Sequence, residues 1–160
     1  MSANATLERR EVVTAFLRHG GKILLVRRSG KVGSYPGCWS AISGYLEDPT
    51  PLAQARREIG EETGLSAEDI RLVNRGAPLE IPAPELGCCW VVHPFLFDIA
   101  DPRRIMLDWE NTELRWVEPG ALADYRTVPK LLEAFEAVAT PRLYEKRAGA
   151  DKCPPNLIPT

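Results

Sequence analysis

The nine residues 57–65 carry the side chains of this sequence that are best suited to chemistry. They read Arg-Glu-Ile-Gly-Glu-Glu-Thr-Gly-Leu and include the carboxylates Glu58, Glu61 and Glu62. Residues three and four apart share one face of a helix, so these carboxylates are predicted to form one cluster, with Arg57 in reach of Glu61. Such like charges repel, and a hard cation such as Mg²⁺ removes the repulsion because it prefers carboxylate oxygens. The alternative interpretation is a solvated, charged helix surface.

The residues around this stretch predict the helix that positions it. Thr50 can cap the helix N-terminus with its hydroxyl, and Pro51 suits the first helical position, where a missing N–H costs nothing. The helix is predicted to run over 52–63, and Gly64 suits the left-handed residue that ends it. The glutamates are predicted to lie beside a buried apolar stripe. The stripe consists of Leu52, Ala55, Ile59 and Thr63.

Runs rich in β-branched and aromatic residues predict strands on both sides of this helix. Residues 12–17 and 22–27 are joined by His19-Gly20-Gly21, which predicts a β-hairpin. Residues 90–97 are apolar enough to predict a central strand that is buried on both faces. Pro94 within this run favours an edge position or a bulge, because proline lacks the N–H that a sheet ladder uses.

Shorter runs complete the predicted order of elements. Residues 39–42 predict a short strand that ends at Ser43-Gly44, and residues 76–84 predict a proline-rich loop. Residues 129–139 predict a second amphipathic helix. Strands, helix, strands and helix follow one another along the chain. We therefore expect an α+β or mixed α/β fold in which helices cover a sheet.

Composition and charge exclude several classes of protein. The chain has 160 residues, of which 44% are hydrophobic and 26% charged, so we expect a single domain over 1–140 and an extended C-terminal tail over 141–160. The net charge of −2 offers no positive excess for nucleic acid or for an anionic membrane. No apolar run approaches the ~18 residues needed to span a bilayer, and the N-terminus lacks the apolar core of a signal peptide. We expect a cytoplasmic protein with no nucleic-acid or membrane partner.

Residues 57–65 resemble the second half of the Nudix box, whose family pattern ends REUxEExGU, where U is an aliphatic residue. A later Glu-x-x-Glu-x-x-Trp element at Glu110, Glu113 and Trp116 agrees with this resemblance. The resemblance implies a Nudix-type α/β/α sandwich with a mixed sheet between helices. It also implies Mg²⁺ or Mn²⁺ on the box helix. The stretch from Val12 to Gly44 looks similar to Nudix modules found fused to translation initiation factor 2B-like proteins.

The first half of the box departs from the family pattern, which sets a glycine, five residues, a glutamate, seven residues and then the arginine. Counting back from Arg57 places Pro49 at the glutamate and Ser43 at the glycine. The segment Ser-Gly-Tyr-Leu-Glu, which begins at Ser43, matches the family turn Gly-Gly-x-U-Glu if one residue is deleted before Pro49. On that alignment Gly44 and Glu47 match the turn and are predicted to bind substrate, and the first glutamate of the box is missing. This departure bears on substrate geometry more than on metal binding.

The resemblance also implies roles for the side chains of the box. Glu58, Glu61 and Glu62 are the predicted metal ligands, and Glu58 could alternatively activate water. Arg57 is predicted to orient the glutamates, most simply through Glu61. A backbone carbonyl at residues 43–44 could add a further ligand, because glycine permits close approach of the backbone.

The resemblance also implies a catalytic base that comes from a loop outside the box. The candidates are Glu80, Glu85, Glu110 and Glu113. The resemblance favours Glu110, because several members of the family carry a functional glutamate just before the strand that matches the one with Trp116. Arg27 and Arg28 lie at the end of the second predicted strand and are candidates for binding substrate phosphates, with plain surface charge as the alternative.

These inferences predict a Nudix-type hydrolase that depends on Mg²⁺ or Mn²⁺. Its substrate would be a small nucleotide or nucleoside diphosphate derivative, in which it cleaves a diphosphate linkage. The alternative is a non-catalytic Nudix-fold module that binds a nucleotide and regulates a partner. A homodimer is left open, since no feature of the sequence demands one.

Overall fold

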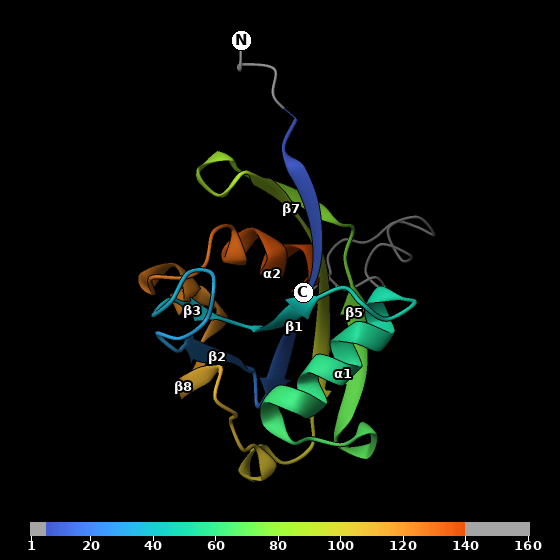
Figure 1. The fold of residues 1–160 in the computed structure, drawn as a ribbon. Coiled ribbons are helices and arrows are strands. Elements are labelled where there is room, and N and C mark those ends of the chain that lie inside the picture. The colour runs from blue at the N-terminus through green and yellow to red at the C-terminus, as the bar shows by residue number, and fades with distance from the viewer. Residues whose placement is uncertain (1–5, 140–160) are drawn as a thin grey trace, which may run out of the picture.

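The computed structural model describes residues 6–139, which form one mixed eight-stranded sheet between two α-helices (Figure 1). The strands are β1 (Glu8–His19), β2 (Lys22–Arg28), β3 (Trp39–Ser40), β4 (Ile42–Tyr45), β5 (Ile70–Arg75), β6 (Leu79–Ala83), β7 (Cys88–Ile99) and β8 (Asn111–Val117). The helices are α1 (Pro51–Thr63) and α2 (Leu131–Ala139). Short 3₁₀ turns are η2 (Ala67–Asp69), η3 (Pro84–Leu86), η4 (Pro102–Arg104) and η5 (Pro119–Asp124). The predicted mixed α/β sandwich is confirmed.

The two helices cover opposite faces of the sheet. Successive residues of a strand point to opposite faces, and β1 shows this alternation. Ala15 and Leu17 pack in the core cluster that includes Ile59 of α1, whereas Phe16 packs in the cluster that includes Phe135 of α2. In Figure 1, α1 lies in front of the sheet. Because the apolar stripe of α1 packs against the sheet, it determines which side chains of the helix face away from the core.

The start and end of α1 lie where the sequence predicts them. The Oγ1 atom of Thr50 accepts a hydrogen bond from the N–H of Ala53 (3.1 Å), and Pro51 is the first helical residue. Gly64 ends the helix with a φ of 76°, in the left-handed region that glycine adopts without strain. These local signals place the glutamates of α1 in a docked helix.

The predicted hairpin of β1 and β2 is confirmed. Its second strand shares one edge of β1 with strand β4. Gly20 and Gly21 form its turn with φ values of 59° and 80°. β1 pairs with β2 through Arg18 and His19, and with β4 over the four residues from Val12 to Ala15. β2 and β4 therefore diverge from each other along the same edge of β1.

Strand β7 is the predicted central strand, and it runs parallel to β1 from Cys88 to Asp98. Of the two alternatives predicted for Pro94, the edge position is wrong, and the pairing of β7 with β5 is irregular nearby, between Leu72 and Asn74. Pro94 faces Thr14 of β1, and on its other side β5 ends and β6 begins, so the missing N–H falls where one neighbouring strand gives way to the next. The carbonyl of Pro94 still accepts a hydrogen bond from the N–H of Gly76 (3.1 Å).

Two predicted segments contain other elements than those expected. The predicted loop over 76–84 contains strand β6, because Ile81 and Ala83 are buried and the strand lies at an edge that tolerates Pro82. The predicted strand over 39–42 is divided into β3 and β4, and β4 continues through the expected end at Ser43-Gly44.

The predicted C-terminal tail and the predicted domain bounds are not tested by the structure and stay predictions. The predicted tail over 141–160 lies outside the described residues. Across residues 6–139, neither helix is long and apolar enough to cross a lipid bilayer.

Candidate metal centre and active site

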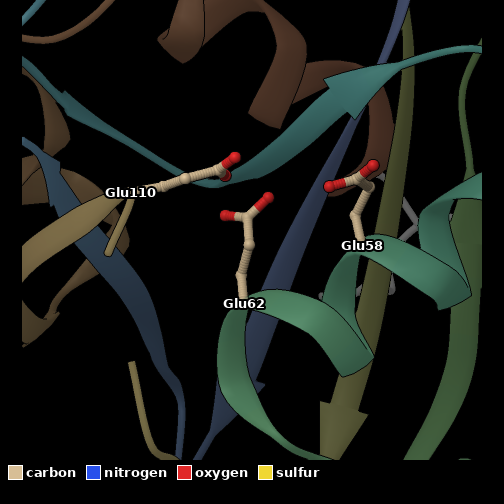
Figure 2. Close-up of side chains that lie close together, drawn as sticks. All are labelled: Glu58, Glu62 and Glu110. Carbon is tan, nitrogen blue, oxygen red and sulfur yellow. The ribbon is translucent and has the colours of Figure 1, made fainter. Parts of the chain in front are cut away.

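Three carboxylates from two distant parts of the chain converge at one place. Glu58 and Glu62 lie one turn apart on α1, and Glu110 immediately precedes β8 (Figure 2). One carboxylate oxygen from each lies within 4.8 Å of the others. The register of the sheet brings Glu110 to the helix, since β8 pairs with β2 and the N–H of Ser29, which follows β2, donates to the carbonyl of Glu110 (2.8 Å).

Glu62 is the most deeply buried of the three carboxylates, with 3% of the residue exposed. Its Oε1 atom accepts a hydrogen bond from Nδ2 of Asn111 (3.1 Å), while its Oε2 atom is buried without a hydrogen-bond partner among residues 6–139. Burial raises the pKa of Glu62 to about 10, and the nearby carboxyl groups of Glu58 and Glu110 add to the shift. A buried, unpaired carboxylate oxygen beside two further carboxylates is the donor set that Mg²⁺ or Mn²⁺ prefers.

The carboxylate of Glu58 is half-buried and lies directly against the backbone of Gly44 in β4. A Cβ atom added to Gly44 would overlap the Glu58 carboxyl group. The Oε2 atom of Glu58 also accepts a hydrogen bond from Nε2 of Gln54 (2.8 Å). Burial raises the pKa of Glu58, and the neighbouring Glu62 carboxyl group and the hydrogen bond from Gln54 oppose that shift. The predicted importance of Gly44 thus acquires a physical basis, since it leaves space for a carboxylate.

Replacing Gly44 by alanine is therefore expected to damage the site more than the fold. The overlapping atoms belong to the end of a flexible side chain, so Glu58 can rotate away while the backbone of β4 stays in place. We expect Mn²⁺ affinity to fall about 10-fold or more, within the range seen when the support of a ligand is lost. Titration of Mn²⁺ by electron paramagnetic resonance, with circular dichroism to check folding, measures both effects. An unchanged Mn²⁺ affinity would contradict this reading of Gly44.

Glu110 is held by its backbone, which leaves its side chain free to face the other carboxylates. Its N–H donates to Oδ1 of Asp108 (3.0 Å). Burial raises the pKa of Glu110, the charges of Asp108 and Glu58 raise it further, and the charge of Arg28 lowers it. Among the four residues predicted as candidate bases, Glu110 is the one that the structure brings to the cluster.

Glu61, the third predicted ligand on the box helix, does not join the three converging carboxylates. Its Oε2 atom accepts a hydrogen bond from Nε of Arg57 (3.1 Å), and its side chain is 55% exposed. The reason is helical geometry, because each residue turns the helix by about 100° and Glu61 is therefore rotated away from Glu62. Arg57 also donates to Oδ1 of Asp48 (3.0 Å), so it ties the segment before α1 to the helix.

The remaining predicted residues divide between the cavity and the outer surface. Arg28 lines the cavity described below, with Nε donating to the carbonyl of Ser34 (2.9 Å). Arg27 is exposed and pairs with Glu113 (3.1 Å). The candidate base Glu80 pairs with Arg9, and Glu85 is exposed in η3. The side chain of Glu47 is exposed as well.

A cavity of about 440 Å³ adjoins the carboxylate cluster at Glu110 and Gly44. It lies where β2 and β4 diverge, with Thr14, Ser40 and Ser43 among the residues of its wall. Four aromatic residues line it: Tyr35, Tyr45, Trp90 and Trp109. Four cationic residues line it as well: Arg10, Arg28, Lys31 and Lys130.

Sequence reasoning missed two residues that support the cluster. Asn111 is buried and holds Glu62, and Gln54 is fully buried and holds Glu58. An amide side chain is uncharged, so it does not stand out in a sequence as a cluster of charged residues does. The one available signal was position, because Gln54 lies four residues before Glu58, on the same helix face.

The sheet between two helices and the converging carboxylates define the class, an α/β/α protein with a candidate metal centre beside a cationic and aromatic cavity. The model of the NUDIX domain family matches residues 8–142, and the chain belongs to this family. The predicted resemblance is thereby confirmed. No curated protein matches the sequence.

Solved structures with the same fold include several Nudix proteins. A MutT protein from Methanosarcina mazei Go1 is 22% identical, with a TM-score of 0.66 over 83% of this chain and 94% of that chain. A MutT NUDIX hydrolase from Burkholderia pseudomallei is 26% identical, with a TM-score of 0.64 over 83% of this chain and 99% of that one. The NUDIX domain of Shewanella oneidensis NrtR, complexed with ADP ribose, is 15% identical, with a TM-score of 0.61 over 85% and 88% of the two chains.

Proposed function

We propose that this protein is a metal-dependent hydrolase that cleaves a diphosphate linkage in a small nucleoside diphosphate derivative. The observation that carries the proposal is the position of the carboxylates, since Glu110 belongs both to the converging cluster and to the wall of the cavity. A diphosphate group bound in that cavity would lie beside the candidate metal centre. Mg²⁺ or Mn²⁺ held by Glu58 and Glu62, with Glu110 beside it, would neutralise charge on the diphosphate oxygens.

The cavity walls suit the two chemical parts of such a substrate. Arg28 and Lys31 offer positive charge to phosphate oxygens, and Arg28 lies close enough to Glu110 to lower its pKa. Trp90 and Tyr45 offer aromatic faces, with ring centroids 6.1 Å apart, on which a nucleobase can stack. The Nε1 atom of Trp90 already donates to the hydroxyl of Tyr35 (3.0 Å), which fixes the indole ring.

The reaction needs a positioned water and a base, because phosphoryl transfer leaves little covalent work for side chains. The water oxygen forms a bond to one phosphorus, the bridging P–O bond breaks, and the proton of the water passes to the base. We assign the base to Glu110, whose pKa is raised by burial and by neighbouring carboxylates. Arg57 acts indirectly, because its contacts are with Glu61 and Asp48.

A substrate panel with a metal control tests this function. Nucleoside diphosphates linked to a sugar, to a second nucleoside and to phosphate would be incubated with Mg²⁺ or Mn²⁺, and the products followed by ³¹P nuclear magnetic resonance. We expect cleavage of at least one compound, and loss of that cleavage in EDTA. If no compound is cleaved while another Nudix hydrolase is active in parallel, the proposal fails.

The second candidate is a binding module that recognises a nucleotide without cleaving it. It is favoured by the missing first glutamate of the box, where Pro49 stands, and by the solved NrtR domain, whose complex holds ADP ribose. This candidate predicts that ADP-ribose raises the melting temperature and is recovered intact in the presence of Mg²⁺. Turnover of the bound compound would contradict it. A homodimer, and a location in the cytoplasm, remain part of the proposal for either function.

A further inference from the structure

Gln54 is an unusual residue for its place in the fold. It lies in the first turns of α1, and none of it is exposed to solvent. A buried polar side chain is costly unless each of its polar groups has a partner. The partners of Gln54 therefore show what the side chain is used for.

Both ends of the Gln54 amide are satisfied, and they hold two different parts of the molecule. The Oε1 atom accepts hydrogen bonds from the backbone N–H groups of Glu47 and Asp48, each at 2.8 Å. The Nε2 atom donates to Oε2 of Glu58 at 2.8 Å. Two backbone donors face the same atom, so that atom is the amide oxygen and the orientation of the amide is determined. Gln54 thus joins the turn before α1 to a carboxylate of the cluster.

The contact with Glu58 opposes a specific repulsion. The carboxylate of Glu58 lies close to those of Glu62 and Glu110, and like charges favour rotation of the side chain away from them. Gly44 leaves room for the carboxylate but holds it by no hydrogen bond that the structure shows. Arg57, the obvious cation on the same helix, pairs with Glu61 and Asp48 instead. The amide of Gln54 is therefore a neutral donor that holds Glu58 toward the cluster.

The same amide holds the turn whose sequence departs from the family pattern. The pattern glutamate is absent and Pro49 stands in its place, one residue after the two N–H groups that Gln54 receives. We propose that Gln54 is a positioning residue, which binds the shortened turn at Glu47–Asp48 and aims Glu58 into the carboxylate cluster. This inference rests on the proposed function only for its kinetic readout, because metal binding and the hydrogen bonds of the amide can be measured without turnover.

The first experiment uses the unaltered protein. Gln54 is the single glutamine of the sequence, so selective ¹⁵N-glutamine labelling yields one side-chain amide signal pair. We expect the amide proton that faces Glu58 to exchange slowly with water and its shift to change when Mg²⁺ is added. In Glu58→Gln the exchange should be faster, because a neutral acceptor binds the amide more weakly. Fast exchange in the unaltered protein would overturn the proposal.

The second experiment separates the contact with Glu58 from the contact with the turn. Gln54→Glu keeps an oxygen that accepts from Glu47 and Asp48, but it places a carboxylate against Glu58 instead of a donor. We expect Mn²⁺ affinity to fall about 10-fold to 100-fold, and kcat to fall by a similar factor with KM little changed. A folded Gln54→Glu protein with unaltered Mn²⁺ affinity would overturn the proposal.

A double variant in which the two side chains are exchanged serves as a second test if the Gln54→Glu protein is poorly folded. Gln54→Glu combined with Glu58→Gln restores one donor and one acceptor between the two positions. We expect the swap to recover the melting temperature but not the Mn²⁺ affinity, because the carboxylate then lies at position 54. Recovery of the full Mn²⁺ affinity would contradict the proposal. If the unaltered protein bound no Mn²⁺, the proposed function would fail and the exchange of the glutamine amide alone would decide on Gln54.

Discussion

Replacing Glu62 by glutamine is expected to abolish hydrolysis while making the metal-free protein more stable. The carboxylate of Glu62 is buried, one of its oxygens has no hydrogen-bond partner in the described part of the chain, and two further carboxylates lie beside it. A glutamine keeps the oxygen that accepts from Asn111 and adds N–H groups that can donate to Glu58 or Glu110. We expect a gain of roughly 1–3 kcal/mol, the usual range for hydrogen bonds to charged groups.

The dependence of stability on pH provides a second readout of the same substitution. The pKa of Glu62 is raised to about 10 from an ordinary value of 4.5, so the folded protein binds more protons than the unfolded chain between these values. By linkage, the stability of the metal-free protein falls as the pH rises through this window. We expect Glu62→Gln to lessen that fall, and urea denaturation in EDTA at about pH 6 and about pH 8.5 measures it.

Two comparison variants show whether the effect belongs to the site. Glu136→Gln makes the same chemical change on an exposed part of α2 and is expected to leave activity and stability unchanged. Glu61→Gln is expected to weaken Mn²⁺ binding less than Glu62→Gln, because Glu61 faces Arg57 and lies outside the cluster. A Glu62→Gln protein that is destabilised in EDTA, or that still gains stability from Mg²⁺ as the unaltered protein does, would contradict our reading of the centre.

Replacing Glu110 by glutamine is expected to lower kcat by about 100-fold or more, which is the lower end of what general base catalysis contributes. Glu110 faces the cluster and the cavity, and glutamine has nearly the same shape but accepts no proton at neutral pH. Mn²⁺ affinity should fall less than in Glu62→Gln, because the more deeply buried Glu62 with its unpaired oxygen remains. Steady-state kinetics and Mn²⁺ titration on the same preparations distinguish the two effects.

Glu113→Gln is the matched comparison for Glu110→Gln, because Glu113 lies on the adjoining strand β8 and was another predicted base. Its side chain is exposed and pairs with Arg27 on the outer surface (3.1 Å). We expect near-normal kcat in Glu113→Gln. A larger loss of kcat in Glu113→Gln than in Glu110→Gln would move the base to the other glutamate.

Local signals predicted the box helix well because each acts over a few neighbouring residues. The hydroxyl of Thr50, the ring of Pro51 and the left-handed Gly64 determine where α1 begins and ends without reference to the rest of the fold. The same holds for the turn at Gly20-Gly21. The pairing of strands was predicted less well, since the alternation of apolar residues along a strand does not say which strands are neighbours. Strand β6 was missed for that reason, and the edge position considered for Pro94 was wrong.

For the candidate site, too, local features could be predicted from the sequence and long-range contacts could not. By itself, the sequence determined the helix, the spacing that places Glu58 and Glu62 one turn apart, and the family to which the chain belongs. Only the tertiary structure decided that Glu110 completes the cluster. The physical reason is that a helix repeats its geometry at every residue, whereas the approach of Glu110 depends on how β8 pairs with β2 across the sheet.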